Sequence, residues 1–481
     1  MSSPVIWILF PGLAGVVLFI LQKYRRAVIF TGTLLAFLLG VLAWQLPIGR
    51  AISLGMVSLQ LSDTLTIFGR QFVLNTKDQS ILILIYLGLA FWFAGSLTAR
   101  VSRMFIPLGL AIAGLITAVL AVEPFLYAAL FIELIVLVSI PLLVSPGNLA
   151  GRGVIRYLVF QTLGFPFILF AGWSLGGMEN GLLSPVLSVF SYVMLGLGFW
   201  FLMGIFPFHS WIPMLSEQSH PYSVAFLLYK LTLGISLFAL GIFDRYGWLR
   251  ETIGLFQLLE IAGVMMIITG GIGAAFERHL GRLMSYGVLV EIGISILAIR
   301  VGLVEPGENT RLGIFFATLY PRALSLGVWA LAAVTISRLV NSSLGDAASP
   351  EKLTFKNIQG AARRFPIAAI GLLLAQFSLA GFPLLVGFPV RLALWTEIAH
   401  DSTLIAALAL SGFFGLIVGG FRTMAVLVMG SDDQDWETNE RPEERLLLGL
   451  GGIALVVMGV FPQIFTPLFA RMAEAFLQAL P

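Results

Sequence analysis

The sequence predicts an all-α membrane protein that crosses the bilayer many times. Of its 481 residues, 58% are hydrophobic and only 11% are charged, and the mean hydropathy is +0.97. A soluble domain is nearer half apolar and a quarter charged. Apolar runs of the ~20 residues that a helix needs to cross the hydrocarbon core recur along the whole chain. Together these observations indicate a polytopic, integral membrane protein in a lipid bilayer.

The apolar runs divide the chain into about fourteen transmembrane helices. We expect the first to be a retained helix and not a cleaved signal peptide, because Lys23, Arg25 and Arg26 follow it and no basic residue precedes it. The expected spans are residues 4–22, 27–46, 79–98, 104–121, 124–144, 154–174, 186–206, 222–242, 252–275, 280–300, 313–337, 366–386, 402–429 and 446–470.

Three connections between these spans have a character of their own. Residues 47–78 alternate polar and apolar side chains and predict a small hairpin outside the membrane. Residues 341–364 are polar and basic and predict an interfacial helix, whereas the acidic run 432–444 predicts a solvated loop. The expected parts are residues 1–103 with the first three helices, 104–242 and 243–429 with five helices each, and 430–481 with the acidic loop and the last helix.

The distribution of the 28 lysines and arginines predicts the orientation. Most of them fall in the odd-numbered connections, and cytoplasmic loops carry an excess of these residues. We therefore expect both termini to face away from the cytoplasm. The odd-numbered connections hold Lys23, Arg25, Arg26, Arg100, Arg103, Arg152, Arg156, Arg278, Arg282, Arg338, Lys352, Lys356, Arg363, Arg364, Arg422, Arg441 and Arg445.

Two of the expected helices are broken. The seventh meets Pro207 in the segment FPFHSWIP, and the twelfth is interrupted over residues 380–389. These are corresponding positions if helices 4–8 and 9–13 form two five-helix repeats, the second inverted relative to the first. Irregular backbone at membrane depth is tolerated only where protein or a water-filled cavity surrounds it. Broken helices at matching places of inverted repeats are typical of transporters.

Charged residues inside the apolar spans are the candidate functional residues, because ionisable groups in a bilayer are costly and rare. Any one of them can be explained as half of an ion pair that joins two helices. Spread over helices 5 and 8–12, they favour a continuous polar axis, and His209 lies in the broken segment of helix 7. The charged set is Glu133, Lys230, Glu260, Glu291, Arg322 and Arg391.

The chemistry of this set suits proton movement. Burial favours the neutral form of a lysine and a nearby carboxylate favours its charged form, so Lys230 is the best candidate for a switchable site. We expect Glu133 to be its partner, with Glu291 serving the second half. Arg322 and Arg391 do not release protons and act as fixed charges or gates.

The other two candidates have less definite roles. His209 titrates near neutral pH when unperturbed, so it is either a relay or the cap of a broken helix. Glu260 is either a supporting residue or a contact to another subunit.

The composition also excludes several kinds of site. The chain has no cysteine, its four histidines show no metal-ligand spacing, and no glycine-rich phosphate loop follows a strand. We expect no cofactor or metal in this chain, so any redox chemistry takes place in a partner. The sequence pI of about 9.2 is better explained by basic residues in the loops of a membrane protein than by nucleic-acid binding.

The motifs of helices 4–13 resemble those of the antiporter-like subunits of respiratory complex I, a family that includes Mrp-type antiporters and membrane-bound hydrogenases. FPFHSWIP followed by a helix with Lys230, the helix-5 residue Glu133, the stretch 277–293 and the stretch 357–395 carry the resemblance. The segment LYPRALSLGVWAL is most similar to the subunit N (chain 2) type.

The resemblance implies a function for the whole complex. It implies fourteen helices, inverted repeats, a hydrated axis, and proton translocation driven by quinone reduction in other subunits. Those partners, some of them homologous antiporter-like subunits, would hold the flavin, the iron–sulfur clusters and the quinone of an NADH:quinone oxidoreductase. The expected location is a bacterial or archaeal cytoplasmic membrane, or the organelle or thylakoid equivalent.

Two positions depart from the family pattern. The family usually has a lysine shortly before the Pro-Phe-His motif, where this chain has Leu202, and another lysine where this chain has Arg391. Both changes remove a titratable amine. We therefore also consider a scaffold subunit that no longer pumps, a subunit of a multi-subunit Na+/H+ antiporter and, less favoured, an ordinary metabolite transporter.

Overall fold

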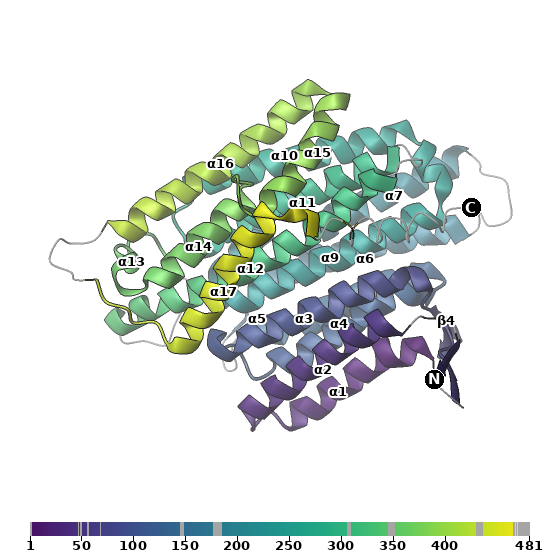
Figure 1. Ribbon diagram of the computed structural model, residues 1–481. Helices are drawn as coiled ribbons and strands as arrows, with labels where there is room; N and C mark the ends of the chain where they lie inside the picture. The colour runs from purple at the N-terminus through teal and green to yellow at the C-terminus, as the bar shows by residue number, and fades with distance from the viewer. Residues whose placement is uncertain are drawn as a thin grey trace.

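The computed structural model is a bundle of long helices that run roughly alongside one another (Figure 1). Nine helices of the described part are long and apolar enough to cross a membrane, and four further apolar helices are shorter. These spans confirm a predominantly helical polytopic membrane protein. The structure describes residues 2–46, 48, 51–54, 57–67, 69–144, 149–176, 185–304, 309–344, 352–429, 436–464, 467 and 469.

The N-terminal helices lie along one side of the bundle (purple and blue in Figure 1). Short strands join α2 to α3, which confirms strand structure within residues 47–78. β1 pairs with β2, and β3, β4 and β5 form a second antiparallel sheet in that order. The elements are η1 Val5–Leu9, α1 Phe10–Ile20, α2 Arg25–Gln45, β1 Ala51–Leu54, β2 Val57–Gln60, β3 Thr64–Ile67, β4 Arg70–Val73, η2 Thr76–Asp78, α3 Gln79–Ala99 and β5 Val122–Glu123.

The middle of the chain contains the first helix break. After α7 ends at Leu202, the chain turns at Gly204, which has a φ of +62° that favours glycine, and then enters η4 and α8. The elements are α4 Phe105–Ala121, η3 Phe125–Tyr127, α5 Ala128–Leu143, α6 Arg152–Gly176, α7 Pro185–Leu202, η4 Phe208–Ser210, α8 Trp211–Gln218 and α9 Pro221–Arg245.

The second break has the same construction. α14 ends at Leu379 and Gly381 follows with a φ of +71°, before α15 starts at Gly387. The elements of this half are η5 Gly247–Glu251, α10 Ile253–Phe276, α11 Leu280–Val304, α12 Asn309–Leu344, α13 Ala361–Arg364, α14 Pro366–Leu379, α15 Gly387–Asp401, α16 Thr403–Val428, α17 Pro442–Val460 and η7 Pro462–Ile464.

Within the expected interfacial helix of residues 341–364, the structure describes one short helix, α13. The end of α12 reaches Leu344, and residues 345–351 lie outside the described residues. α12 itself is 36 residues long and contains Pro321 directly before Arg322. The basic segment therefore combines the end of a long helix with a single helical turn.

α9 and α11 form the centre of the bundle. In their most apolar windows 94% and 89% of residues are buried, against 44% for α10 and α16. A helix that is apolar and buried all round belongs to the interior of a large protein. The two central helices are also the ones that carry Lys230 and Glu291, so these charges lie away from lipid.

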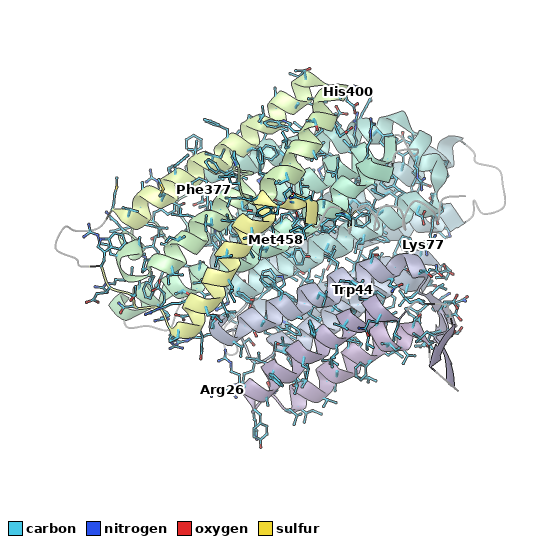
Figure 2. All side chains as sticks on the ribbon, viewed as in Figure 1. Arg26, Trp44, Lys77, Phe377, His400 and Met458 are labelled. Carbon is cyan, nitrogen blue, oxygen red and sulfur yellow. The ribbon has the colours of Figure 1, made fainter. Side chains whose placement is uncertain are left out.

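The connections that hold most of the lysines and arginines lie at one end of the bundle. Figure 2 shows Arg26 at one end of the bundle, and Lys77 and His400 at the opposite end. The segment around α13 and the end of α16 lie at the same end as the connection between α1 and α2 (left in Figure 1). The odd-numbered connections, which hold most of the basic residues, therefore gather at one end.

The expectation of a solvated acidic loop over residues 432–444 is wrong for two of its glutamates. Glu440 and Glu444 are buried. Glu440 Oε1 accepts hydrogen bonds from the backbone N–H groups of Ile367 and Ala368 at 2.8 and 3.3 Å, where α14 begins. Glu444 accepts from Arg338 Nη1 at 2.6 Å, across from α12 to α17. These two carboxylates are buried and hydrogen-bonded to protein groups, so they are not part of a solvated loop.

We expect Glu444→Gln to lower the free energy of unfolding by about 2 kcal/mol, because it removes the buried carboxylate that pairs with the partly buried Arg338. Glu443→Gln is the matched control, since Glu443 is exposed on the same helical turn and should change stability by less than about 0.5 kcal/mol. Thermal unfolding in detergent measures both variants. Equal losses would contradict a structural role for the buried pair.

Candidate functional site: buried charges beside two broken helices

A carboxylate held by two arginines lies inside the second half. Glu291 of α11 contacts Arg322 of α12, with 3.1 Å between Oε2 and Nε. Its other oxygen, Oε1, accepts a hydrogen bond from Nη2 of Arg391 on α15. Relative exposures are 4% for Glu291, 1% for Arg322 and 7% for Arg391. We call these three residues the Glu291 triad, and it carries one net positive charge.

Neutral groups complete the partners of the triad. Arg322 Nη2 also donates to the Glu291 carbonyl oxygen at 2.7 Å and to the Ser295 hydroxyl, one turn further along α11. Arg391 Nη1 donates to the Ser378 carbonyl oxygen at 2.9 Å, at the end of α14. Ser378 and Ser325 link α14 to α12 by a hydroxyl hydrogen bond of 2.8 Å. Buried charges persist when they are paired and hydrogen-bonded in this way.

The second helix break makes the space that Arg391 occupies. A Cβ atom at Gly381 would lie 2.5 Å from Arg391 Cδ, and one at Gly387 would overlap Arg391 Nη1 and the Ser378 carbonyl oxygen. Both positions therefore need glycine for steric reasons, and Gly381 needs it for its positive φ as well. The break positions a charged side chain as well as interrupting the helix.

Lys230 on α9 is fully buried and reaches the N-terminal helices. Its Nζ donates to the Ile85 carbonyl oxygen of α3 at 2.9 Å and lies 5.6 Å from the ring centroid of Tyr229. A Cβ atom at Gly88 would lie 3.9 Å from both Lys230 Nζ and Tyr229 Oη. Tyr229 Oη has no hydrogen-bond partner among the described residues. Within the described part of the chain, the ammonium group thus meets a backbone dipole and a ring, and no carboxylate.

The expected pairing of Lys230 with Glu133 is wrong. No ion pair among the described residues joins them, because Lys230 turns toward α3. Glu133 is half-buried, and its Oε1 accepts a hydrogen bond of 2.7 Å from the hydroxyl of Thr162 on α6. Thr162 is exposed, so this carboxylate lies at the α5–α6 face of the bundle. A charge at a face of a membrane protein needs cover from another protein or from water.

Leu202, which stands where the resemblance implies a lysine, is an apolar packing residue. Leu202 is buried against Gly164 of α6, where an added Cβ would lie 2.8 Å from Leu202 Cγ. Gln161, next to Thr162, donates from Nε2 to the Leu202 carbonyl oxygen at 2.9 Å. Gln161 Oε1 is buried without a partner in the described part of the chain. An unpaired acceptor of this kind is a place for an ordered water.

The remaining candidates lie elsewhere. Glu260 on α10 pairs with Arg300 at 3.0 Å, and Arg300 also contacts Asp401 at the end of α15, so Glu260 belongs to a separate, partly exposed cluster. His209 lies in η4, half-buried and stacked on Phe206 with ring centroids 5.6 Å apart. Among the seven candidates, the structure brings together Glu291, Arg322 and Arg391 only.

Sequence reasoning missed the neutral members of these sites. Ser295 and Ser378 contact the triad, Gln161 and Thr162 lie near the first break, and Tyr229 is beside Lys230. One signal was available, because Gln161 and Thr162 are adjacent polar residues inside an otherwise apolar span. The hydroxyl groups gave no signal, since serine and threonine are common in membrane helices.

Comparison with known proteins identifies the relatives of this chain. A family model described as NADH:quinone oxidoreductase/Mrp antiporter, TM, matches residues 125–417. A curated relative, NADH-quinone oxidoreductase subunit N of Polaromonas naphthalenivorans, is 25% identical over 351 residues, which is 69% of this chain and 69% of the relative.

Two solved structures share the fold. A chain of respiratory complex I from Thermus thermophilus superposes with a TM-score of 0.72 at 18% identity, covering 96% of this chain and 98% of that one. A chain of the Mrp complex from a Dietzia species gives 0.75 at 15% identity, covering 100% and 99%. The helical arrangement is therefore common to redox-linked and antiporter complexes.

We expect Glu291→Gln to destabilise the protein more than Arg391→Gln. The first change leaves two buried guanidinium groups without a counter-charge, whereas the second leaves the neutral pair of Glu291 and Arg322. Removing one partner of a buried pair costs about 3–5 kcal/mol, so Glu291→Gln should lose at least this much. Unfolding midpoints of the two variants give the comparison, and the reverse order would show that the triad is not the controlling interaction.

Proposed function

We propose that this chain, which belongs to the NADH:quinone oxidoreductase/Mrp antiporter transmembrane family, is a proton-conducting, antiporter-like membrane subunit of a complex I-type quinone oxidoreductase. The observation that carries the proposal is the burial of Lys230 and the Glu291 triad in helices next to the two breaks. Buried charges at such positions mark ion pathways. Quinone reduction, with its donor, flavin and iron–sulfur clusters, belongs to partner subunits.

Lys230 is the side chain best placed to change its charge during conduction. Arg322 and Arg391 keep their protons, and Glu291 is engaged by both of them. Lys230 has no carboxylate partner among the residues that the structure describes, so there it can gain or lose a proton without breaking an ion pair. The triad then serves as the fixed charge that the moving proton meets in the second half.

Neutral groups replace the missing lysine in the first half of the proposed route. At the α5–α6 face, the Thr162 hydroxyl donates to Glu133. The preceding residue, Gln161, donates to the Leu202 carbonyl oxygen. A water on Gln161 Oε1 would continue this line toward the helix break. His209 lies within that break and is available as a further relay.

The finer architecture follows the family. We infer fourteen transmembrane helices and two inverted repeats, supported by the positive-φ glycines at matching breaks, Gly204 and Gly381. The repeats would occupy residues 104–242 and 243–429. Both termini would face away from the cytoplasm, because the basic connections gather at the other end.

The partners follow from the half-exposed carboxylate of Glu133. Leu130 and Leu134 of α5 and Leu163 of α6 are exposed around it. Lipid alone would leave this charge in hydrocarbon, whereas a neighbouring antiporter-like subunit would bury it. We infer that such a subunit covers the α5–α6 face in a bacterial or archaeal cytoplasmic membrane or its organelle equivalent.

A second candidate function is a scaffold that does not pump. Leu202 and Arg391 favour it, because each stands where a titratable lysine is usual in the family. A sodium/proton antiporter subunit is the third, supported by the fold shared with the Mrp complex.

The deciding variant is Lys230→Met in the whole complex, reconstituted in sealed vesicles. If Lys230 conducts, the variant reduces quinone but moves fewer protons per electron, because this chain's share of the pumped protons is lost. Lys23→Met, which removes an exposed lysine at a helix turn, should keep the full ratio.

An unchanged ratio in Lys230→Met, with normal assembly, would replace the proposal with the scaffold function. Proton exchange that requires sodium and needs no electron donor would replace it with the antiporter function.

A further inference from the structure

A basic cleft lies outside the charged site, at the end of the bundle where α13 is found (left in Figure 1). Its volume is about 700 Å³, and four separate segments form its walls. These are α8, the link from α10 to α11, the segment before α13, and the end of α16. Its charged lining residues are Arg278, Arg282, Lys356, Arg422, Glu217 and Glu277.

Most of the positive charge in this cleft is uncompensated. Arg282 engages both acids, with 2.5 Å to Glu217 and 3.9 Å to Glu277. The exposed side chains of Arg278 and Lys356 have no partner in the described part of the chain. These two cations therefore remain available to a ligand.

Arg422 adds a third cation that is held in place. Its Nη1 donates to the Ala275 carbonyl oxygen, and its guanidinium lies 5.7 Å from the ring centroid of Phe355. Neither contact neutralises its charge. The anchored guanidinium of Arg422, beside the exposed Arg278 and Lys356, can bind a phosphate group, because the paired N–H donors of a guanidinium match two phosphate oxygens.

The cleft opens onto apolar surface on one side. Val426 and Met429 of the α16 end line it, and Met429 is exposed. α10 and α16 pack side by side, and they expose Phe276, Phe421 and Val428 near the same end. A single ligand in this position would meet cations at one end and membrane-facing apolar side chains at the other.

We propose that the cleft binds the phosphate headgroup of an anionic phospholipid, with its acyl chains along α10 and α16. Arg278, Lys356 and Arg422 hold the headgroup. Basic pockets between membrane helices are a recurrent way of binding acidic lipid headgroups. The ligand must be an amphiphile, because phosphate alone would leave the apolar wall of the cleft unused.

The test uses the full chain, purified in its complex, stripped of lipid and supplied with phosphatidylglycerol or with uncharged-headgroup phosphatidylcholine. Native mass spectrometry measures the lipid retained. We expect the wild type to retain phosphatidylglycerol preferentially, and the double variant Arg278→Gln/Lys356→Gln to bind it about thirtyfold more weakly.

Two matched controls separate this effect from a general loss of charge. Lys23→Gln/Arg103→Gln removes two exposed basic residues from other odd-numbered connections and should leave retention unchanged. Arg278→Lys/Lys356→Arg keeps both charges and should bind phosphatidylglycerol as the wild type does, which would show that binding requires the positive charge at these two positions.

Three results would overturn the proposal. Equal retention of both lipids would exclude headgroup recognition. Inorganic phosphate or glycerol phosphate displacing the lipid at micromolar concentration would identify a soluble anion as the ligand. A photo-crosslinker at Gln359 that captures an acidic segment of another subunit, with no lipid present, would identify a protein ligand.

Discussion

A carboxylate held between two guanidinium groups in apolar surroundings is the interaction on which the second half of the bundle depends. Glu291, Arg322 and Arg391 come from three helices, and all three side chains are buried. Attraction between charges is strongest where the dielectric constant is low, and so is the cost of an unpaired one. α11, α12 and α15 are therefore constrained to stay together, and Gly381 and Gly387 keep the space that this requires.

The first half handles its charges differently. Lys230 is compensated by a backbone carbonyl and an aromatic face, and Glu133 by a hydroxyl group. Neither side chain has an ion-pair partner among the described residues. The second half thus holds its charges in the ion-paired Glu291 triad, whereas the first half holds Lys230 and Glu133 by hydrogen bonds to neutral groups. The helix breaks of the two halves nevertheless share a glycine with positive φ. This arrangement suits a chain in which the protonation of Lys230 or Glu133 changes while the charge of the Glu291 triad stays constant.

The sequence allowed the predominantly helical, membrane-spanning fold and both breaks to be predicted, because apolar runs and prolines are local signals. It also placed the buried charges on the correct helices. It could not predict partners, since Lys230 donates to the carbonyl oxygen of Ile85 on α3, more than a hundred residues earlier. Glu440 and Glu444 were misassigned for the same reason, because an acidic run looks solvated until α12 and α14 are placed beside it.

The length of α12 and the position of Pro321 within it have a mechanical consequence. Its 36 residues extend ~54 Å at helical rise, which exceeds a hydrocarbon core of ~30 Å. One continuous rod therefore links Arg322 in the interior to Arg338 near the bundle end. Pro321 lacks the N–H that would bond the Ala317 carbonyl oxygen, so the rod has a compliant point next to Arg322. A change of angle there would move Arg322 and Arg338, which both follow Pro321 in the helix, together relative to the turns of α12 that precede Pro321.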